Sequence, residues 1–537
     1  MRTGIFMNGR TPRLSRRLIG PNRLRLWPIS WPLVVCLAAA MIGLVGVTWL
    51  VLPAHHHPKL LKFSAAGPGS PPARVCGNDA ILGGGPKSSP TGAVTVPAGD
   101  NSGLNWGRVK TTYWFAPGTH TLGPGEYTQI IAGDGSTYVG APGAVLDGQQ
   151  TNYFAFGGYA TNVTISYLTV QNFGTLGGNN NEGVVNQDSA SGWTIDHSTL
   201  TDNAGAGTML GSGNTVSYSC LKDNQQYGFN AYSGVGDPAN ITLDHDEIAG
   251  NNTYNWEAHI TDCGCDGGGK FWRVNGAVVT NNWVHDNKSV GLWADMDNRG
   301  FDIENNYISG NYAEGIVYEA SYNAVIKNNT FLRDGIGAGP NIPGFPTPAI
   351  YVSESGSDSR VAGPYGSTFS ITGNKFTDNW GGVVLWENAD RFCGSPANPS
   401  TDCTLVKPSV ATAASCNSTN IANPPYHDDC RWKTQNVSVY HNLFDFNPAD
   451  IGSSCTMANY CGFQGLFSQY GSYPSWSPFK GIVVENHITF DQKNHFASNT
   501  YNGPWHFMAH QQGNTVSWAT WRASPYDQDA GSTLNPR

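Results

Sequence analysis

Three short stretches of the chain repeat one pattern: NNWVHDN at Asn281–Asn287, NNYISGN at Asn305–Asn311 and GNKFTDN at Gly373–Asn379. In each stretch an apolar residue is followed three positions later by Asn, and another Asn stands two positions before it. With Asn or Asp at the later position, the pattern occurs eight times, and its apolar residues are Leu200, Leu221, Ile248, Val284, Ile308, Phe331, Phe376 and Phe444. The chain is therefore a repeat protein.

The spacing of the copies predicts the shape of the repeat. Successive apolar residues are 21, 27, 36, 24, 23, 45 and 68 positions apart, so a unit of little more than twenty residues carries insertions of different lengths. Short β-prone runs of that period, separated by Asn and Gly, are typical of the coils of a parallel β-helix. We therefore predict an all-β solenoid that forms one long domain.

The repeated Asn residues form two ladders, one on each side of the apolar position. Asn tolerates left-handed backbone geometry, and its amide can bond the Asn of the next coil, so we expect a structural role at turns. The first ladder is Asn282, Asn306, Asn329, Asn374, Asn442 and Asn486, and the second is Asn203, Asn224, Asn251, Asn287, Asn311, Asn379 and Asn447.

Composition narrows the class of partner. The chain of 537 residues contains 66 Gly, 12% aromatic residues and only 13% charged residues, and its net charge is -9. A stiff, turn-rich and aromatic surface of this kind suits sugars, and the repeat region shows no basic patch for nucleic acid. We therefore expect a polysaccharide partner, no nucleic acid and a monomer.

The N-terminus has the features of a membrane anchor. Residues 1–30 are rich in Arg, and residues 31–52 form an uncharged run, WPLVVCLAAAMIGLVGVTWLVL. A secretory signal core has about 7–15 apolar residues, whereas a spanning helix needs about 20. We therefore predict a cytoplasmic segment at 1–30, a single transmembrane signal-anchor helix at 31–52, a flexible tether at 53–75 and an extracellular remainder. The alternative is a signal peptide cleaved near Ser64–Ala66, which would make the protein secreted.

Residues 76–537 are then expected to form the β-helix domain. We place an N-terminal cap at about 76–160, repeat coils at about 161–490 and a C-terminal cap at about 491–537. A Cys-rich insertion at about 392–435 interrupts the coils.

Cysteine usage agrees with export. Ten of the eleven Cys residues lie beyond the apolar run, an even number that favours disulfides. Cys455 and Cys461 can close a short loop. For Cys263 and Cys265 we favour disulfides over a metal site, because no second cluster with zinc spacing is present.

The chain resembles the right-handed parallel β-helix repeat proteins of the pectate-lyase-like superfamily, above all their secreted, mostly actinobacterial members. The likeness spans about Trp114 to Trp521 and is strongest across Gly267–Asn329, which reads GGGKFWRVNGAVVTNNWVHDNKSVGLWADMDNRGFDIENNYISGNYAEGIVYEASYNAVIKNN. The resemblance implies right-handed coils. It leaves the activity open, because this architecture hosts lyases, hydrolases, epimerases and non-catalytic surface proteins.

The second Asn ladder locates a column of polar residues. Counting eight residues on from it reaches Asp295, Glu319 and Glu387 in three coils, and His259 in an earlier coil. Because successive coils stack about 4.8 Å apart, residues of equal phase form a column. Stacked carboxylates inside an apolar coil would cost several kcal/mol each, so we expect the column to face outward. Trp293 beside it would complete a groove for a sugar chain.

Two adjacent carboxylates suit glycoside hydrolysis. Asp295 and Glu319 should lie about 5 Å apart, which is the separation of retaining glycosidases, with one nucleophile and one acid/base. Asp297, expected on the same face two residues on, would leave room for a water molecule and favour inversion. A glycoside hydrolase that needs no cofactor is our first choice.

A lyase or epimerase requires a base for the proton beside a uronate carboxylate and a cation that neutralises this carboxylate. Lys270 and Arg273 are the nearest cations, and Glu257 could join either kind of site. Such an enzyme could also use Ca2+, for which the expected ligands are Asp295, Asp297 and Glu319.

In total, the expected catalytic residues are Asp295, Glu319, Asp297, Glu257 and Lys270, and the expected substrate-binding residues are His259, Trp293, Tyr322, Glu387 and Arg273. A non-catalytic adhesive or carbohydrate-binding solenoid is the remaining alternative. Carboxyl oxygens of Asp295 and Glu319 within about 6 Å in a groove favour an enzyme, whereas burial in salt bridges favours a binding or structural role.

Overall fold

The computed structural model describes residues 70–536, apart from 261–263, 362, 389–392, 394–403, 407–409, 470–474 and 480–481. The predicted cytoplasmic segment, the predicted spanning helix and most of the predicted tether lie outside the described residues. Within the described part of the chain, no helix is long and apolar enough to cross a membrane.

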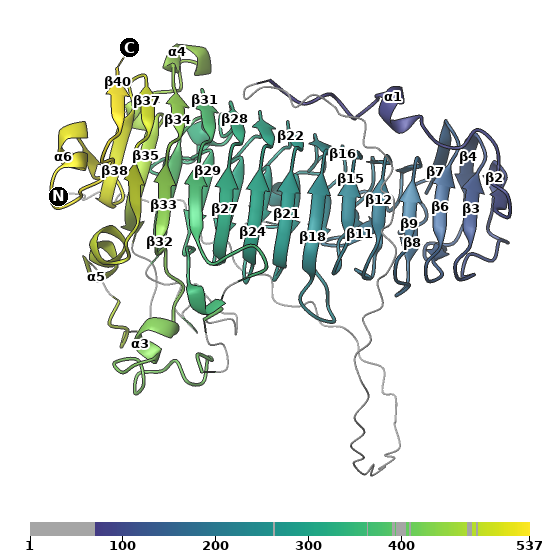
Figure 1. Cartoon of the computed structure of the whole chain (residues 1–537), viewed down its shortest axis with the longest axis horizontal. Helices are drawn as coiled ribbons and strands as arrows, with labels where there is room; N and C mark the ends of the chain where they lie inside the picture. The colour runs from purple at the N-terminus through teal and green to yellow at the C-terminus, as the bar shows by residue number, and fades with distance from the viewer. Residues whose placement is uncertain are drawn as a thin grey trace, which may run out of the picture.

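Three long sheets run the length of an elongated solenoid (Figure 1). The first has 13 strands: β1 (Val94–Val96), β3 (Thr112–Phe115), β6 (Thr137–Gly140), β9 (Thr164–Ser166), β12 (Thr194–Asp196), β15 (Thr215–Ser217), β18 (Ala239–Asp244), β21 (Asn275–Thr280), β24 (Arg299–Glu304), β27 (Tyr322–Lys327), β30 (Phe369–Thr372), β33 (Val437–Tyr440) and β36 (His495–Ala497).

The second sheet has 14 strands: β2 (Gly99–Asp100), β4 (Gly118–Thr121), β7 (Ala144–Asp147), β10 (Thr169–Gln171), β13 (Thr199–Thr201), β16 (Cys220–Lys222), β19 (Glu247–Ala249), β22 (Trp283–His285), β25 (Tyr307–Ser309), β28 (Thr330–Leu332), β31 (Lys375–Thr377), β34 (Leu443–Asp445), β37 (Thr500–Asn502) and β40 (Thr533–Asn535).

The third sheet has 11 strands: β11 (Gly183–Val185), β14 (Ala206–Met209), β17 (Tyr227–Ala231), β20 (Gly269–Phe271), β23 (Leu292–Ala294), β26 (Ile316–Glu319), β29 (Ile350–Ser353), β32 (Val383–Asn388), β35 (Phe463–Gln469), β38 (His506–Gln511) and β39 (Thr515–Val516). A small sheet pairs β5 (Ile130–Ile131) with β8 (Phe156–Gly157). Neighbouring strands are parallel except β38 and β39, so consecutive coils stack in one direction.

Short helices lie in the connections and near the ends of the solenoid. The α-helices are α1 (Asp79–Leu82), α2 (Trp256–His259), α3 (Tyr426–Asp429), α4 (Pro448–Ile451), α5 (Ile482–Asn486) and α6 (Trp518–Arg522). The 3-10 helices are η1 (Gly339–Asn341), η2 (Ser359–Val361) and η3 (Met457–Asn459), and η4 (His487–Asp491) is a π-helix.

The eight apolar residues of the repeat form one continuous column in the core. Each is opposite the next in the 14-stranded sheet, from Leu200 and Leu221 through to Phe376 and Phe444. All eight side chains are fully buried. The repeat pattern thus predicted both the register and the inner face of this sheet correctly.

Most of the first predicted Asn ladder is present. Each ladder Asn from Asn282 to Asn442 is hydrogen-bonded to the ladder residue of a neighbouring coil. Its side-chain oxygen accepts from the backbone N–H of the residue in the preceding coil, or its side-chain amide donates to the residue in the next coil, as Asn306 does to Asn329 at 3.0 Å. The prediction was wrong at Asn486, which ends α5, and Asn499 takes that place below Asn442. Asn486 is not at a turn between coils, because the chain forms α5 and η4 here before it returns to the solenoid at β36.

The second ladder also runs as predicted, from Asn203 through Asn311 and on to Asn379. Asp334 fills the rung between Asn311 and Asn379. The prediction was wrong at Asn447, whose side chain instead caps the N-terminus of α4.

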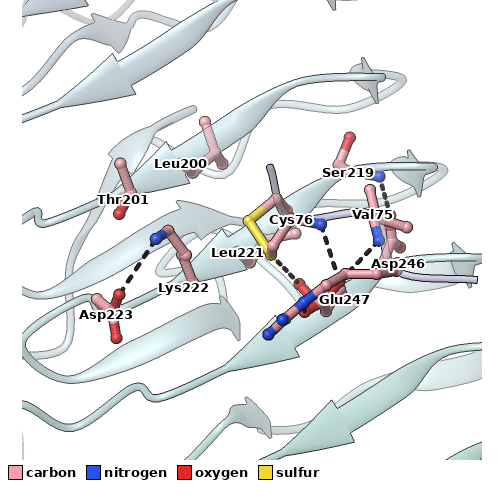
Figure 2. The surroundings of a disulfide bond; sticks show 12 residues. Val75, Cys76, Leu200, Thr201, Ser219, Leu221, Lys222, Asp223, Asp246 and Glu247 are labelled. Atoms are coloured by element: carbon pink, nitrogen blue, oxygen red, sulfur yellow. Dashed lines mark hydrogen bonds and ion pairs between the residues drawn. A yellow bond between two sulfur atoms is a disulfide. The ribbon is translucent and has the colours of Figure 1, made fainter. Parts of the chain in front are cut away.

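A segment that we call the N-terminal strap, residues 70–86, lies along the outside of the solenoid and leads to its first coils (Figure 1). Its Cys76 forms a disulfide with Cys220 in β16 (Figure 2). Further along, the Trp114 indole of β3 donates to the carbonyl of Pro86 at 2.8 Å. The strap therefore connects the middle of the solenoid to its second coil, which contains β3.

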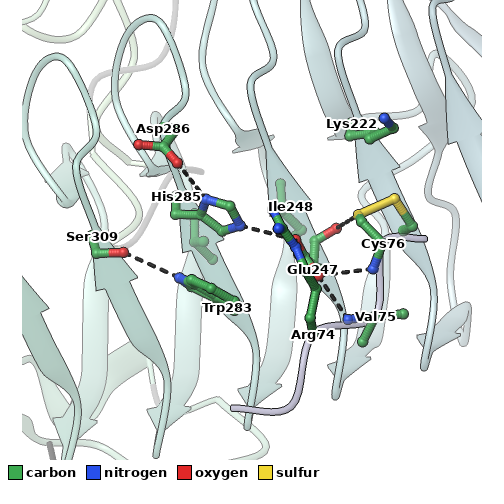
Figure 3. A network of polar contacts seen from close by, with 12 residues as sticks. Arg74, Val75, Cys76, Lys222, Glu247, Ile248, Trp283, His285, Asp286 and Ser309 are labelled. Carbon is green, nitrogen blue, oxygen red and sulfur yellow. Dashed lines mark hydrogen bonds and ion pairs between the residues drawn. A yellow bond between two sulfur atoms is a disulfide. The ribbon is translucent and has the colours of Figure 1, made fainter. Parts of the chain in front are cut away.

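Glu247 of β19 holds the strap through a buried carboxylate (Figure 3). It accepts backbone N–H groups of Val75 at 2.7 Å and Cys76 at 2.8 Å, and pairs with Arg74 at 3.2 Å and His285 at 3.1 Å. Burial acts to raise the pKa of Glu247, but the hydrogen bonds from His285 and the strap lower it below its usual value. The strap is thus bound to an ionised carboxylate.

Two other disulfides join Cys416 to Cys430 and Cys455 to Cys461, and the second confirms the predicted short loop. Cys265 is also disulfide-bonded. The described cysteine chemistry therefore agrees with the disulfides expected of an exported protein.

Candidate active site

The outer face of the 11-stranded sheet carries the central candidate residues. Leu292 and Ala294 of β23 point into the core, as do Ile316 and Tyr318 of β26. By strand alternation Trp293 points outward, and Asp295 follows on that outer face. Asp295 and Glu319 therefore lie outside the apolar core of the coils, as predicted. The predicted exposed groove was wrong, because both acids are buried and Trp293 is only 1% exposed within a second apolar cluster.

Lys270 and Asp295 form an ion pair across two coils. Lys270 in β20 lies opposite Trp293 in β23, and its ammonium is 2.7 Å from the Asp295 carboxylate. The ammonium also lies 4.1 Å from the centroid of the Trp293 ring. The two charged side chains are 10% and 8% exposed, so the pair is largely shielded from water.

Glu319 adjoins Asp295 in the next coil. Ala294 and Tyr318 are paired residues, so the acids that follow them are neighbours across a strand spacing of about 4.8 Å. Glu319 is 4% exposed and Asp295 is 6% exposed. The structure therefore brings together the two acids that the repeat phase predicted.

Asp297 lies close to this pair but not on the same strand. β23 ends at Ala294, and Asp297 has a left-handed φ of 61° in the turn that follows. Its carboxylate is 3.4 Å from Arg273, which also pairs with Asp237 at 2.8 Å. The prediction that Asp297 continues the outer face of the strand was wrong, because the backbone turns before it.

Glu257 reaches Lys270 through the backbone of Gly264. The Glu257 carboxylate accepts from the Gly264 N–H at 2.9 Å, and the Gly264 carbonyl accepts from the Lys270 ammonium. The sequence interpretation missed Gly264, because no motif marks a loop carbonyl as a lysine partner.

His259 is not a member of the acid column. It ends α2, is exposed and stacks on Tyr254 with ring centroids 3.9 Å apart. In its coil the place of β23 is taken by β20, which begins only at Gly269. Counting eight residues failed here because an insertion separates the ladder from the strand.

Glu387 also departs from the predicted column. Glu319 lies opposite Ser353, and Ser353 lies opposite Trp386, so Glu387 is one residue out of phase. Its fully buried carboxylate pairs with Arg431 and accepts from Gln492 at 2.6 Å. The expected outward placement was wrong, and Glu387 instead joins the end of the Cys-rich insertion to β32.

Tyr322 is buried instead of lining a groove. Its ring stacks on Trp432 with centroids 5.4 Å apart, and its hydroxyl accepts from the Lys433 N–H at 3.4 Å. Burial raises the pKa of this hydroxyl well above its usual value. These contacts show that Tyr322 packs in the interior of the protein.

The expected calcium ligands are not gathered into one cluster in the described part of the chain. In the described ranges, no group of three or more His, Cys, Asp or Glu side chains is arranged to hold a metal ion. Two of the three expected ligands, Asp295 and Asp297, are engaged by Lys270 and Arg273. The geometry is that of paired acids and cations.

A family model described as "Right handed beta helix region" matches residues 182–363. The matched residues are therefore coils of a right-handed parallel β-helix, and the parallel sheets continue the same coils on either side of them. The match covers the coils that contain Lys270, Asp295 and Glu319. A search of curated proteins found no match to the sequence.

Solved structures resemble this β-helix protein in fold. The A-module of the mannuronan C-5 epimerase AlgE4 of Azotobacter vinelandii is 15% identical, with a TM-score of 0.37 over 66% of this chain and 87% of that one. The AlgE6 A-module of the same organism is 15% identical, with a TM-score of 0.36 over 66% and 83%. A PL6 alginate lyase in complex with a trisaccharide is 10% identical, with a TM-score of 0.32 over 83% and 97%.

Proposed function

We propose that this β-helix protein is an extracytoplasmic enzyme that modifies a uronate-containing polysaccharide by removing the proton beside the uronate carboxylate. The reaction is that of a lyase or an epimerase. The disulfides support a location outside the cytoplasm, and the N-terminal run at 31–52 supports attachment to the membrane.

One observation carries the proposal: charged residues replace apolar ones at two columns of the outer face. The column of Lys270 continues with Trp293, Val317, Tyr351 and Val384 in successive coils. The neighbouring column contains Asp295 and Glu319, and continues with Ser353, Trp386 and Phe467.

A buried ion pair on such a face adds little stability. Desolvation of Lys270 and Asp295 offsets most of their attraction, and apolar residues of similar size are often as stable or more stable. The fold fills the same positions with apolar side chains a few coils away. We infer that the charges are retained for chemistry.

The sign of the charge in the transition state favours proton abstraction over hydrolysis. Glycoside hydrolysis passes through a cationic, oxocarbenium-like state, which the Lys270 ammonium would destabilise. Removal of the uronate proton instead places negative charge on the sugar carboxylate, which Lys270 would stabilise. The order of the two reactions expected from the sequence is therefore reversed.

The residues then take distinct roles. Glu319 accepts the C5 proton, and Lys270 neutralises the substrate carboxylate after exchanging part of its contact with Asp295. In a lyase the electron pair forms a C4–C5 double bond as the C4–oxygen bond breaks, and the leaving oxygen takes up a proton. In an epimerase a proton returns to C5 from the opposite face.

The shielding of Lys270 and Asp295 in a salt bridge favours one other function, a non-catalytic carbohydrate-binding solenoid. In that case the pair would only shape the surface. The two functions differ in whether any glycan is chemically changed.

The test is a product screen with the extracytoplasmic part of the chain on polyuronates and on neutral glycans. A lyase gives unsaturated uronates, an epimerase changes the C5 configuration seen by NMR, and a hydrolase gives new reducing ends without unsaturation. We expect one of the first two, lost in Glu319→Gln and retained in Glu257→Gln at a reduced rate. Binding without any product would reject the enzyme, and unsaturation-free cleavage would reject proton abstraction.

A further inference from the structure

A pocket of about 290 Å³ lies at the corner between the 14-stranded and 11-stranded sheets. Three successive coils form it, each through the turn that follows β22, β25 or β28. Its volume is at the lower end of the range of about 300–1,000 Å³ for ligand pockets, which suits a single sugar ring.

The rim of the pocket combines an aromatic ring with two cations. Tyr312 is 48% exposed. Lys288 and Arg333 are also exposed and line the same space. The Lys288 ammonium makes no ion pair within the described part of the chain.

Two glycines keep the space open. A Cβ atom on Gly337 would lie 2.2 Å from an atom of the Tyr312 ring, so the ring packs directly against the backbone of Gly337. Gly310 has a left-handed φ of 64°, and a Cβ atom there would lie 2.8 Å from the Asp286 carboxylate. A side chain at either position would therefore disturb the rim.

The local charge is opposite to that of the whole chain. The residues that line the pocket include two cations and one carboxylate, Asp286, which already accepts from His285 at 2.7 Å. Arg333 also donates to the Asp450 carbonyl at 2.7 Å and lies near the Asp378 carboxylate, outside the lining. The whole chain carries a net charge of -9. A cationic pocket on an acidic protein selects an anionic ligand, and an exposed Tyr ring suits the apolar face of a sugar.

We propose that this corner pocket binds one acidic sugar residue of a glycan. Tyr312 stacks on the sugar ring, and Lys288 and Arg333 bind its carboxylate. The pocket precedes β26 and Glu319 ends β26, so this site is separate from the proposed active site. The proposal agrees with the proposed substrate class, but it rests on the charges and shape of the pocket.

The experiment measures binding of trigalacturonate and of the neutral trigalactose by calorimetry. Every variant carries Glu319→Gln so that the probe is not consumed. We expect trigalacturonate to bind at least tenfold more weakly to Tyr312→Ala and to the double variant Lys288→Ala/Arg333→Ala. Lys222→Ala, which removes another exposed lysine on the solenoid, is the matched control and should bind like its parent.

Undiminished binding in both pocket variants would overturn the proposal, and so would equal binding of trigalactose. Circular dichroism verifies that the variants are folded, and the three substituted pocket side chains, Tyr312, Lys288 and Arg333, are exposed. Turnover by the wild-type protein is measured separately. Absence of turnover with intact pocket-dependent binding would reject the proposed function alone, and turnover without pocket-dependent binding would reject the pocket alone.

Discussion

Asp334 occupies a rung of the second ladder at which neighbouring coils carry Asn. One carboxylate oxygen accepts from the backbone and side chain of Asn311, both at 2.9 Å, while the other is buried without a partner. Burial raises the pKa of Asp334 to about 7. An Asn at this position would retain the acceptor and could donate to Asn379, as other rungs do.

The Asp334→Asn variant should therefore gain stability relative to the wild type as the pH rises from about 4 to 7, with the full gain above pH 7. Between about pH 4 and 7 the folded state keeps a proton that the unfolded state has lost, so wild-type stability falls as the pH rises through this range. The loss at higher pH is on the order of 2–4 kcal/mol. Thermal melting at pH 8 should show a clear gain in Tm, and melting at pH 4 little change. An equal difference at both pH values would contradict the assigned pKa.

The Lys270–Asp295 pair allows a residue-scale test of function against stability. Lys270→Met alone leaves Asp295 buried without its cation and should cost about 3–5 kcal/mol. Lys270→Met/Asp295→Leu replaces both charges and should regain most of the wild-type Tm, with no activity. A double variant that melts as low as the single one would show that the pair is needed for folding.

At the scale of elements, the sequence predicted what the repeat period controls. The apolar column, most of both ladders and the Asp295–Glu319 adjacency depend on intervals of constant length, so counting located them. His259 and Glu387 could not be located in this way, because insertions shift the strand relative to the ladder. Partners such as Gly264 are brought to Lys270 by a loop, whose conformation has no period.

Glu387 provides a prediction at this scale. Its carboxylate links β32 to Arg431 and Gln492, so Glu387→Ala leaves Arg431 buried without its partner. We expect a fall in Tm corresponding to about 3–5 kcal/mol with the same product per folded molecule. Melting curves measure the fall in Tm. The amount of product divided by the amount of folded protein, determined without reference to activity, measures the product per folded molecule. A folded variant without activity would contradict this prediction and would show that Glu387 belongs to the active site.

At the scale of the whole molecule, the N-terminal strap adds a long-range connection to a solenoid whose coils otherwise contact mainly their neighbours. The strap joins the coil of Glu247 to the second coil, and the Cys76–Cys220 disulfide spans 144 residues of sequence. Residues 74–76 therefore lie beside the middle of the solenoid and not at its end.

Removal of this disulfide should destabilise the first coils. A disulfide contributes about 2–4 kcal/mol, and longer loops contribute more. Cys76→Ser/Cys220→Ser should lower the Tm and speed amide exchange in residues 94–201. Cys455→Ser/Cys461→Ser, whose loop spans only 6 residues, is the control with a smaller effect. Equal exchange in both variants would show that the strap does not couple the coils.

The central claim is that Glu319, beside the Lys270–Asp295 pair, removes the C5 proton of a uronate. The most direct measurement is turnover of a polyuronate in D2O, followed by NMR of the sugar products for the wild type and for Glu319→Gln. The account predicts C5 deuterium in epimerised residues or C4–C5 unsaturation at new chain ends, both absent with Glu319→Gln. Cleavage with neither mark, or full activity in Glu319→Gln, would contradict it.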